Sequence, residues 1–236
     1  MKLARSLHKH TTLLRSGKAL PRSSKALLGL GAIAALALAL SACGGGGARQ
    51  AATWQPPASL ERLMNLFPTP AKRAPSFTLT DQRGRSVSLD SLRGRVVVLE
   101  PMDPKCTSLC PIVSQDFVDA AHALGGRSSR VAFLGINVNQ YHARVADMLA
   151  FSRLHLLEPL PGWHFLTGST RQLRRVWRSY GIAVKPSRSG DVAHSALMEF
   201  IDPRGRERWL ASPNYNKAAI PQWGAGIATV AGHLVG

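Results

Sequence analysis

Cysteine and acidic side chains are both scarce in this chain. Its 236 residues include three cysteines, and 13 acidic side chains stand against 30 basic ones, which gives a formal net charge of +17. Such an excess favours partners that carry negative charge, such as acidic proteins, anionic lipid or nucleic acid. The chain lacks the interleaving of basic and aromatic residues that is typical of nucleic-acid-binding surfaces. We therefore expect no nucleic acid partner, and we interpret the basic stretch RQLRRVWR (171–178) as a solvated helix face or a face turned to lipid.

The positive charge is unevenly distributed along the chain. Residues 1–42 carry seven basic side chains and no acidic one, whereas the remainder carries 23 basic and 13 acidic residues. The basic lead is followed by an uncharged stretch, Ala26–Ala42, that ends in small residues, as secretory signal peptides do. The sequence LSAC (Leu40–Cys43) resembles the lipobox of bacterial lipoproteins. This resemblance implies a lipoprotein signal peptide over residues 1–42 and a lipid attached to Cys43.

The expected location is therefore extracytoplasmic, with the chain anchored to a bacterial membrane as a lipoprotein. The alternative is a single N-terminal transmembrane anchor that is not cleaved. Its 17 apolar or small residues would reach about 25 Å as a helix, which is short for a bilayer core. We favour the lipoprotein.

Residues 43–74 are predicted to form a flexible tether. The stretch GGGGARQAATWQPPAS (44–59) contains glycine and proline and lacks apolar periodicity. The following LERLMNLF (60–67) has apolar residues at helical spacing, which indicates a short helix before PTPAKRAP ends it. We expect one folded domain over residues 75–236.

Segments with strand and helix character alternate in that domain. SFTLTD and SVSLD flank QRGR and predict an N-terminal β-hairpin extension. RVVVLEP and RVAFLGINVN are apolar runs typical of strands buried on both faces. The alternation predicts an α/β domain with a central, mostly parallel sheet flanked by helices. Helices are expected over Pro111–Leu124, Ala143–Leu154, 169–181 and Ile220–Leu234, and further strands at WHFLTG (163–168) and on both sides of the turn at 202–205.

Two of the cysteines, Cys106 and Cys110, lie in DPKCTSLCP (103–111), between a predicted strand and a predicted helix. The carboxyl ends of such strands are where α/β sheets present ligand sites. Pro111 suits the first helical turn, which places Cys110 at the helix N-terminus, where the dipole favours a thiolate. Lys105 acts in the same direction. If the loop turns helically, the two Cα atoms lie about 6 Å apart, so that a structural disulfide, a redox pair and a metal site all stay open. The structural disulfide is the least favoured, because the loop is too short to constrain much of the unfolded chain.

From about Pro75 to the C-terminus, the sequence resembles the SCO/SenC family of thioredoxin-fold copper proteins. The opening FTLTDQRGRSVSLDSLRGRVVVL is shared more broadly with redoxins. The more specific features are the three-residue spacing between the cysteines with a proline after it, WHFLTG, and HSALMEFIDPRG (194–205), where His194 precedes a strand. In the family, the two cysteines and this histidine bind copper, and the proteins help to build the copper centre of cytochrome oxidase or handle its thiols. The resemblance implies a thioredoxin-like fold with a central mixed sheet, and Cys106, Cys110 and His194 as copper ligands.

The chemistry of this ligand set suits copper. Copper(I) is soft and prefers thiolates, while imidazole is a borderline ligand that also suits copper(II). Zinc is disfavoured, because a closed structural zinc site normally has four protein ligands. Met102 and Asp103 precede the pair, and we interpret them as a core residue and a turn residue. The other histidines in the domain are interpreted as surface or packing residues.

The sequence departs from the family at the site. Thr107, Ser108 and Leu109 stand between the cysteines, where Pro-Asp is common, and Ala193 stands where an aspartate often precedes the histidine. Fewer carboxylates lower the negative field, which weakens copper(II) more than copper(I) or marks a branch that mainly performs thiol chemistry.

The leading prediction is a membrane-tethered metallochaperone that delivers copper to a cytochrome oxidase subunit or a related copper protein. The alternative is a thiol–disulfide oxidoreductase in which Cys106 and Cys110 cycle as a redox pair and keep a partner's metal-binding cysteines reduced. A peroxidase is disfavoured, because no distant arginine can be placed beside a Thr-x-x-Cys arrangement, as peroxiredoxins require.

Overall fold

The computed structural model describes residues 54–187, 190, 192–212 and 220–236. The predicted signal peptide over residues 1–42, the lipidation site Cys43 and the first part of the predicted tether lie outside the described residues. Within the described part of the chain, no helix is both long enough and apolar enough to cross a membrane.

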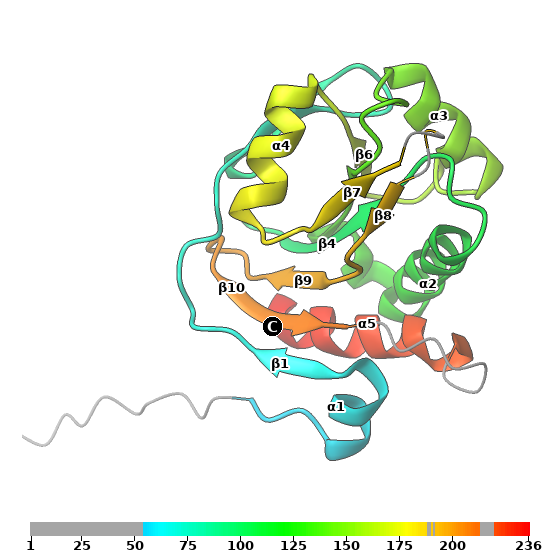
Figure 1. The fold of residues 1–236 in the computed structure, drawn as a ribbon. Helices are drawn as coiled ribbons and strands as arrows, with labels where there is room; N and C mark the ends of the chain where they lie inside the picture. The colour runs from blue at the N-terminus through cyan, green and yellow to red at the C-terminus, as the bar shows by residue number, and fades with distance from the viewer. Residues whose placement is uncertain (1–53, 188–189, 191, 213–219) are drawn as a thin grey trace, which may run out of the picture. The chain divides into compact units, whose positions relative to one another are not determined.

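A six-stranded sheet forms the centre of the molecule, in the order β1-β10-β9-β4-β5-β6 (Figure 1). β4, β5 and β6 run parallel to one another, whereas β9, β10 and β1 continue the sheet with antiparallel pairings. The sheet is therefore mixed, as the family resemblance implied, and only half of it is parallel. The strands are β1 (Leu66–Pro68), β4 (Val96–Met102), β5 (Val131–Asn137), β6 (Trp163–Leu166), β9 (Met198–Ile201) and β10 (Glu207–Ala211).

Each face of the sheet is covered by its own hydrophobic core. Successive side chains of a strand point to opposite faces, so Val96 and Val98 of β4 join one cluster of buried residues while Val97 and Leu99 join the other. α1, α2, α3 and α5 contribute to the first cluster, and α4 with the N-terminal hairpin contributes to the second. The helices are α1 (Ala58–Met64), α2 (Leu109–Leu124), α3 (Val145–Leu154), α4 (Thr170–Ser179) and α5 (Ile220–Val235).

Residues 54–236 form a compact unit. Both clusters and all the strands of the central sheet lie within this unit. A unit with its own hydrophobic core can in principle fold without the rest of the chain, so residues 54–236 are a suitable fragment for experiments.

The predicted N-terminal hairpin is confirmed: β2 (Thr78–Thr80) pairs antiparallel with β3 (Ser86–Ser88). Asp81 organises the connection, because its Oδ1 accepts the backbone N–H groups of Arg83 and Arg85, each at 2.9 Å.

Residues 58–68 form a helix and a strand, although a flexible tether was predicted up to residue 74. α1 buries Leu60 and Met64 in the core, and Leu66 of β1 pairs with Ala211 at the sheet edge. Trp54 stacks on His233 of α5, with ring centroids 4.3 Å apart. The short apolar segment after the Gly-rich stretch thus belongs to the domain, because its side chains have a core to enter.

A second hairpin, β7 (Val184–Pro186) with β8 (Val192–His194), was not predicted. Its strands are three residues long, one ends in proline, and their residues are half-buried or exposed, so no apolar pattern marks them in the sequence. The strand expected directly after His194 begins only at Met198.

Candidate metal and thiol site

The cysteines lie where the sequence placed them: Cys106 lies between the end of β4 at Met102 and the start of α2 at Leu109, and Cys110 lies in the first turn of α2. We call residues 103–108 the cysteine loop. Its structure depends on Asp103, whose buried Oδ1 accepts the backbone N–H of Lys105 at 2.8 Å and whose carbonyl accepts the N–H of Cys106 at 3.1 Å. Asp103 is therefore the predicted turn residue, and Met102 is fully buried as the predicted core residue.

Two asparagines at the end of β5 connect this loop to the sheet by hydrogen bonds. Asn139 Nδ2 lies 3.0 and 3.1 Å from the two carboxylate oxygens of Asp103. The backbone N–H of Asn139 donates in turn to Asn137 Oδ1 at 2.8 Å, and Asn137 Nδ2 donates to Thr167 Oγ1 at 3.1 Å. This buried network was missed in the sequence; asparagines that directly follow an apolar strand (INVN) were the available signal.

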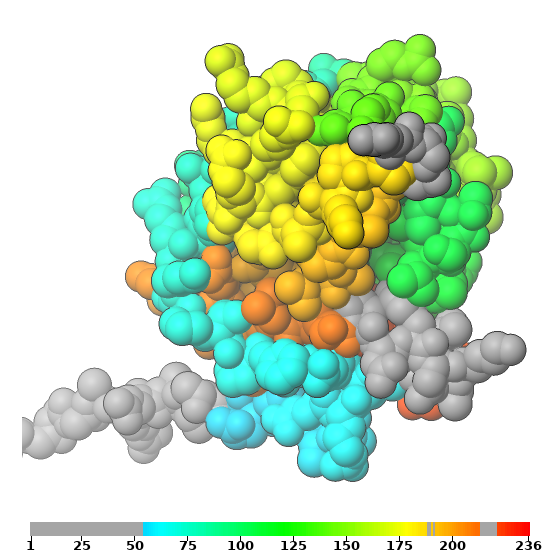
Figure 2. Space-filling model, in the orientation of Figure 1, coloured from blue at the N-terminus to red at the C-terminus, as the bar shows by residue number. Residues whose placement is uncertain are grey.

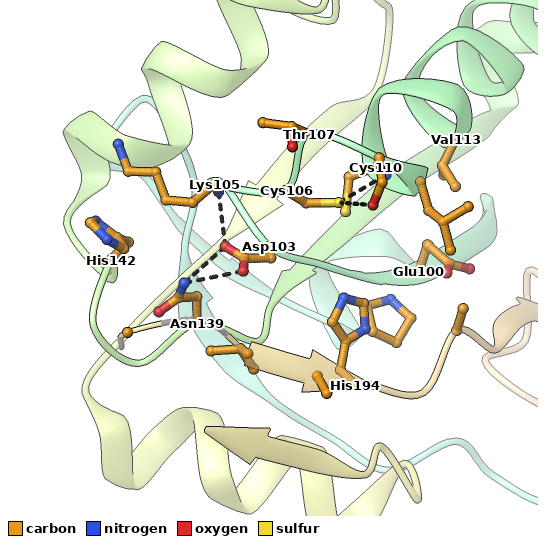
Figure 3. Close-up of a pocket in the computed structure, with 17 residues that line it drawn as sticks. Glu100, Asp103, Lys105, Cys106, Thr107, Cys110, Val113, Asn139, His142 and His194 are labelled. Atoms are coloured by element: carbon orange, nitrogen blue, oxygen red, sulfur yellow. Dashed lines mark hydrogen bonds between the residues drawn. The ribbon is translucent and has the colours of Figure 1, made fainter. Parts of the chain in front are cut away.

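Cys106 and Cys110 are free thiols in close contact (Figure 3). The backbone N–H of Cys110 donates to Cys106 Sγ at 3.3 Å, and the Ser108 hydroxyl lies 3.6 Å from the same sulfur. Cys106 is half-buried, whereas Cys110 is 3% exposed and packs into the core. One thiol is thus accessible and receives hydrogen bonds, and the other is enclosed.

The pKa values of the two thiols are shifted in opposite directions. The hydrogen bond from the Cys110 thiol, assisted by the N–H groups of Cys110 and Ser108, lowers the pKa of Cys106 to about 4 against the opposing effect of burial. The same hydrogen bond, together with burial, raises the pKa of Cys110 far above its ordinary range. At neutral pH the pair is one thiolate, Cys106, and one thiol, Cys110.

The prediction that helix position favours a thiolate at Cys110 is therefore wrong. Cys110 does lie in the first turn of α2. However, its side chain turns into the core, where burial penalises a negative charge, and the donors converge on the sulfur of Cys106 instead.

His194 ends β8 and lines the same cavity as the cysteines, a space of about 490 Å³. Figure 3 shows it on the hairpin, across the cavity from the cysteine loop. Its Nδ1 lies 3.1 Å from the carbonyl oxygen of Ser195, a contact that places the ring proton on Nδ1 and leaves the lone pair on Nε2. Nevertheless, among the described residues no group of three His, Cys, Asp or Glu side chains is close enough to hold a metal ion. The cavity thus brings the three predicted ligands together without joining them at one point.

A buried carboxyl group, Glu100, also lines this cavity. It is 1% exposed, and its Oε2 has no hydrogen-bond partner among the described residues. Burial, and then the nearby charge of Asp116, raise the pKa of Glu100 well above its usual range. RVVVLEP was interpreted as an apolar run, and its single glutamate was the missed signal. His142, interpreted as a surface or packing residue, lines the cavity as well.

Comparison with known proteins identifies the fold and the family. A family model described as SCO1/SenC matches residues 68–223. A curated relative, the SCO1 protein homolog of Bacillus subtilis (strain 168), is 25% identical over 133 residues, which cover 55% of this chain and 68% of the relative. The structure of Bradyrhizobium japonicum ScoI with copper bound is 24% identical with a TM-score of 0.57, covering 69% of this chain and 99% of that one.

Two further similar structures belong to proteins with thiol chemistry. BsSco, described as a member of the Sco family of cytochrome c oxidase assembly proteins with a disulfide switch, is 22% identical with a TM-score of 0.52 and covers 66% of this chain and 93% of that one. The thioredoxin domain of a Bacteroides vulgatus thiol–disulfide oxidoreductase is 17% identical with a TM-score of 0.51 and covers 71% and 99%. The fold is therefore thioredoxin-like, and the chain belongs to the SCO1/SenC family.

Proposed function

We propose that this protein binds copper(I) through Cys106, Cys110 and His194 and passes it to a copper-receiving subunit of cytochrome oxidase or a related copper protein. The observation that carries the proposal is that two adjacent thiols and one imidazole line a single open cavity. Thiolate sulfur is the donor that copper(I) prefers, and imidazole is a suitable third ligand. The copper-bound Bradyrhizobium relative and the membership of BsSco in a family of cytochrome c oxidase assembly proteins support the same assignment.

The order of binding follows from the two thiols. Cys106 is already ionised at neutral pH and offers the first sulfur. Cys110 has to lose its proton to become the second ligand, so copper binding releases a proton. His194 then has to approach from the β7–β8 hairpin, which pairs with no other strand in the described structure. Few protein ligands and an open cavity suit a cargo that is handed on by ligand exchange.

We further propose that Cys43 carries a lipid and that the domain is held outside the cytoplasm on a bacterial membrane. The support is the LSAC sequence after an uncharged apolar stretch.

An anaerobic copper(I) titration of reduced residues 54–236 against a competing chelator tests the copper proposal. We expect one tightly bound copper, and an affinity reduced at least about tenfold in His194→Ala, equivalent to about 1.4 kcal/mol. His122→Ala is the matched control, because this histidine is exposed near the C-terminal end of α2 and does not line the cavity. Equal and weak binding by wild type and His194→Ala would rule out the three-ligand site.

A second function, thiol–disulfide exchange, is favoured by the ionisation of Cys106. The Cys106 thiolate attacks a partner disulfide and forms a mixed disulfide, releasing one partner sulfur as a thiolate. Cys110 then gives up its proton and attacks the Cys106 sulfur. The partner leaves with both thiols reduced, and this protein keeps the two-electron oxidised Cys106–Cys110 disulfide. Such a reaction would keep a partner's copper-binding cysteines reduced.

A further inference from the structure

The exposed surface of the described domain is strongly basic, because most acidic side chains are buried. All 13 acidic residues of the chain lie after residue 60. The buried ones are Asp81, Glu100, Asp103, Asp116, Asp147, Glu199, Asp202 and Glu207. Burial of eight of the 13 leaves the arginines and lysines to dominate the surface potential.

The basic charge is concentrated on α4. Four exposed arginines recur at helical spacing on α4: Arg171, Arg174, Arg175 and Arg178. The opposite side of the helix is buried and carries Leu173, Val176 and Trp177. Within the described part of the chain, none of these four arginines forms an ion pair. Ser169 caps the helix by accepting the N–H of Gln172 at 3.3 Å, so the row of arginines is displayed on a well-formed helix.

A groove runs between α4 and β7, with a volume of about 330 Å³. Arg174 and Arg178 line it together with an apolar floor that includes Ile182 and Val184, and none of the described lining residues is acidic. Arg174 Nη2 donates to Gln140 Oε1 at 3.0 Å, which orients this guanidinium at the rim. Guanidinium groups above an apolar floor are complementary to a peptide segment that carries both carboxylates and aliphatic side chains.

The groove adjoins the cysteine site through two shared elements. The β7–β8 hairpin contributes Val184 to the groove and His194 to the cavity of the cysteines. Likewise Gln140 lines the groove, and His142, two residues later, lines the cavity. In the space-filling view, α4 and the hairpin form adjoining surfaces on one face of the molecule (Figure 2).

We propose that this groove docks the partner protein through an acidic segment and so presents the partner's thiols or copper site to Cys106. This inference rests on the proposed function, because the partner is the protein that receives copper or electrons there. An anionic membrane is the less favoured occupant: α1, at the N-terminal end of the described chain, lies at the opposite end of the domain from α4 (Figure 1). A membrane tether attached at the N-terminal end would therefore bring α1, rather than the groove, close to the membrane.

Peptide binding to residues 54–236 tests the docking surface without requiring any thiol chemistry. The probe is a fluorescein-labelled peptide of alternating acidic and aliphatic residues, with a lysine-containing version of the same length as reference, followed by anisotropy. We expect Arg174→Glu with Arg178→Glu to weaken binding of the acidic peptide at least about tenfold. Arg127→Glu with Arg130→Glu changes the net charge equally at two exposed sites on another element and is expected to weaken it less than about threefold. The double variant Arg174→Gln with Arg178→Gln removes the charges without reversing them. A melting curve for each variant shows whether it is folded.

Three results would overturn the proposal. Equal weakening by both pairs would mean that net charge alone attracts the peptide, and no binding of the acidic peptide by wild type would remove the site. Loss of binding to phosphatidylglycerol vesicles in the Arg174/Arg178 variant, without loss of peptide binding, would assign the helix to lipid. Reaction of Cys106 with neutral hydroxyethyl disulfide separates this proposal from the proposed function: it should be the same in wild type and in the groove variants. If wild type fails to react, thiol exchange is excluded, while the peptide result still decides the docking site.

Discussion

The cysteine loop and the β7–β8 hairpin face the same cavity but are built in opposite ways. The loop is fastened by the buried carboxylate of Asp103 and its two bonds from Asn139, and it leads into a helix packed in the main core. The hairpin is a separate two-stranded sheet whose strand residues are half-buried or exposed. Segments with few buried contacts open at low free-energy cost, whereas buried networks rigidify. The ionisation of the thiols is thus determined by the rigid cysteine loop, whereas the imidazole of His194 comes from the weakly packed hairpin.

The largest effect should come from exchanging the two cysteines for serine one at a time. Cys106→Ser is expected to slow reaction with hydroxyethyl disulfide by about a hundredfold or more, because the ionised nucleophile is lost. Cys110→Ser should still react, and should accumulate the mixed disulfide on Cys106 because no second thiol resolves it. Mass spectrometry of the quenched reaction distinguishes the two. A mixed disulfide trapped on Cys110 in the Cys106→Ser variant, at the wild-type rate, would reverse our assignment.

Removing the anchor of the loop should cost more stability than weakening the hairpin. Asp103→Ala leaves Asn139 Nδ2 and the Lys105 N–H without their acceptor, at a cost of about 1–3 kcal/mol. Ala193→Gly, at an exposed position of β8, should cost about 1 kcal/mol or less. Urea unfolding of residues 54–236 measures both. If Ala193→Gly lowers the free energy of unfolding as much as Asp103→Ala or more, the hairpin is not more weakly packed than the cysteine loop.

The pH dependence of Cys106 alkylation tests whether the cysteine loop sets the ionisation of this thiol. Because its pKa is about 4, the thiolate is present at and above pH 5, and its rate of alkylation by iodoacetamide should change less than about twofold from pH 5 to pH 8. The rate should fall by about half near pH 4. Cys110→Ala removes the thiol that donates to Cys106, so the midpoint should move to higher pH. A wild-type rate that rises about tenfold per pH unit up to pH 8 would show an ordinary thiol.

The smallest effect concerns Glu100, whose folded-state pKa is raised by burial. Such a group contributes stability below its unfolded pKa, and this contribution is lost as pH rises, because ionisation favours the unfolded chain. Glu100→Gln does not titrate, so its free energy of unfolding should improve relative to wild type between pH 4.5 and pH 7.5. Urea unfolding at the two pH values gives the difference. A difference that does not change with pH would mean that folding does not raise the pKa of Glu100.

The parts of this site that follow from local pattern were predictable. Apolar runs gave β4 and β5, and the position of Pro111 gave the helix start, so the cysteine loop was placed correctly. The identity of the thiolate was not predictable, because it depends on which sulfur turns into the core and which receives the N–H groups. Spacing along the chain carries no information about that.

Features made by long-range contacts were also missed. The β7–β8 hairpin has no apolar periodicity, and β1 is defined by pairing with β10, more than 140 residues later in the chain. The Asp103–Asn139 pair joins residues 36 positions apart. The family resemblance, rather than any local signal, singled out His194.

X-ray absorption at the copper edge tests the central claim most directly, because it reports the atoms bound to the metal. Residues 54–236 loaded with one copper(I) would be compared with the His194→Ala variant loaded in the same way. We predict two sulfur ligands and one nitrogen ligand in wild type, and two sulfurs without that nitrogen in the variant. A wild-type spectrum with sulfur ligands alone, unchanged by His194→Ala, would contradict the account and leave Cys106 and Cys110 as a thiol pair without the histidine.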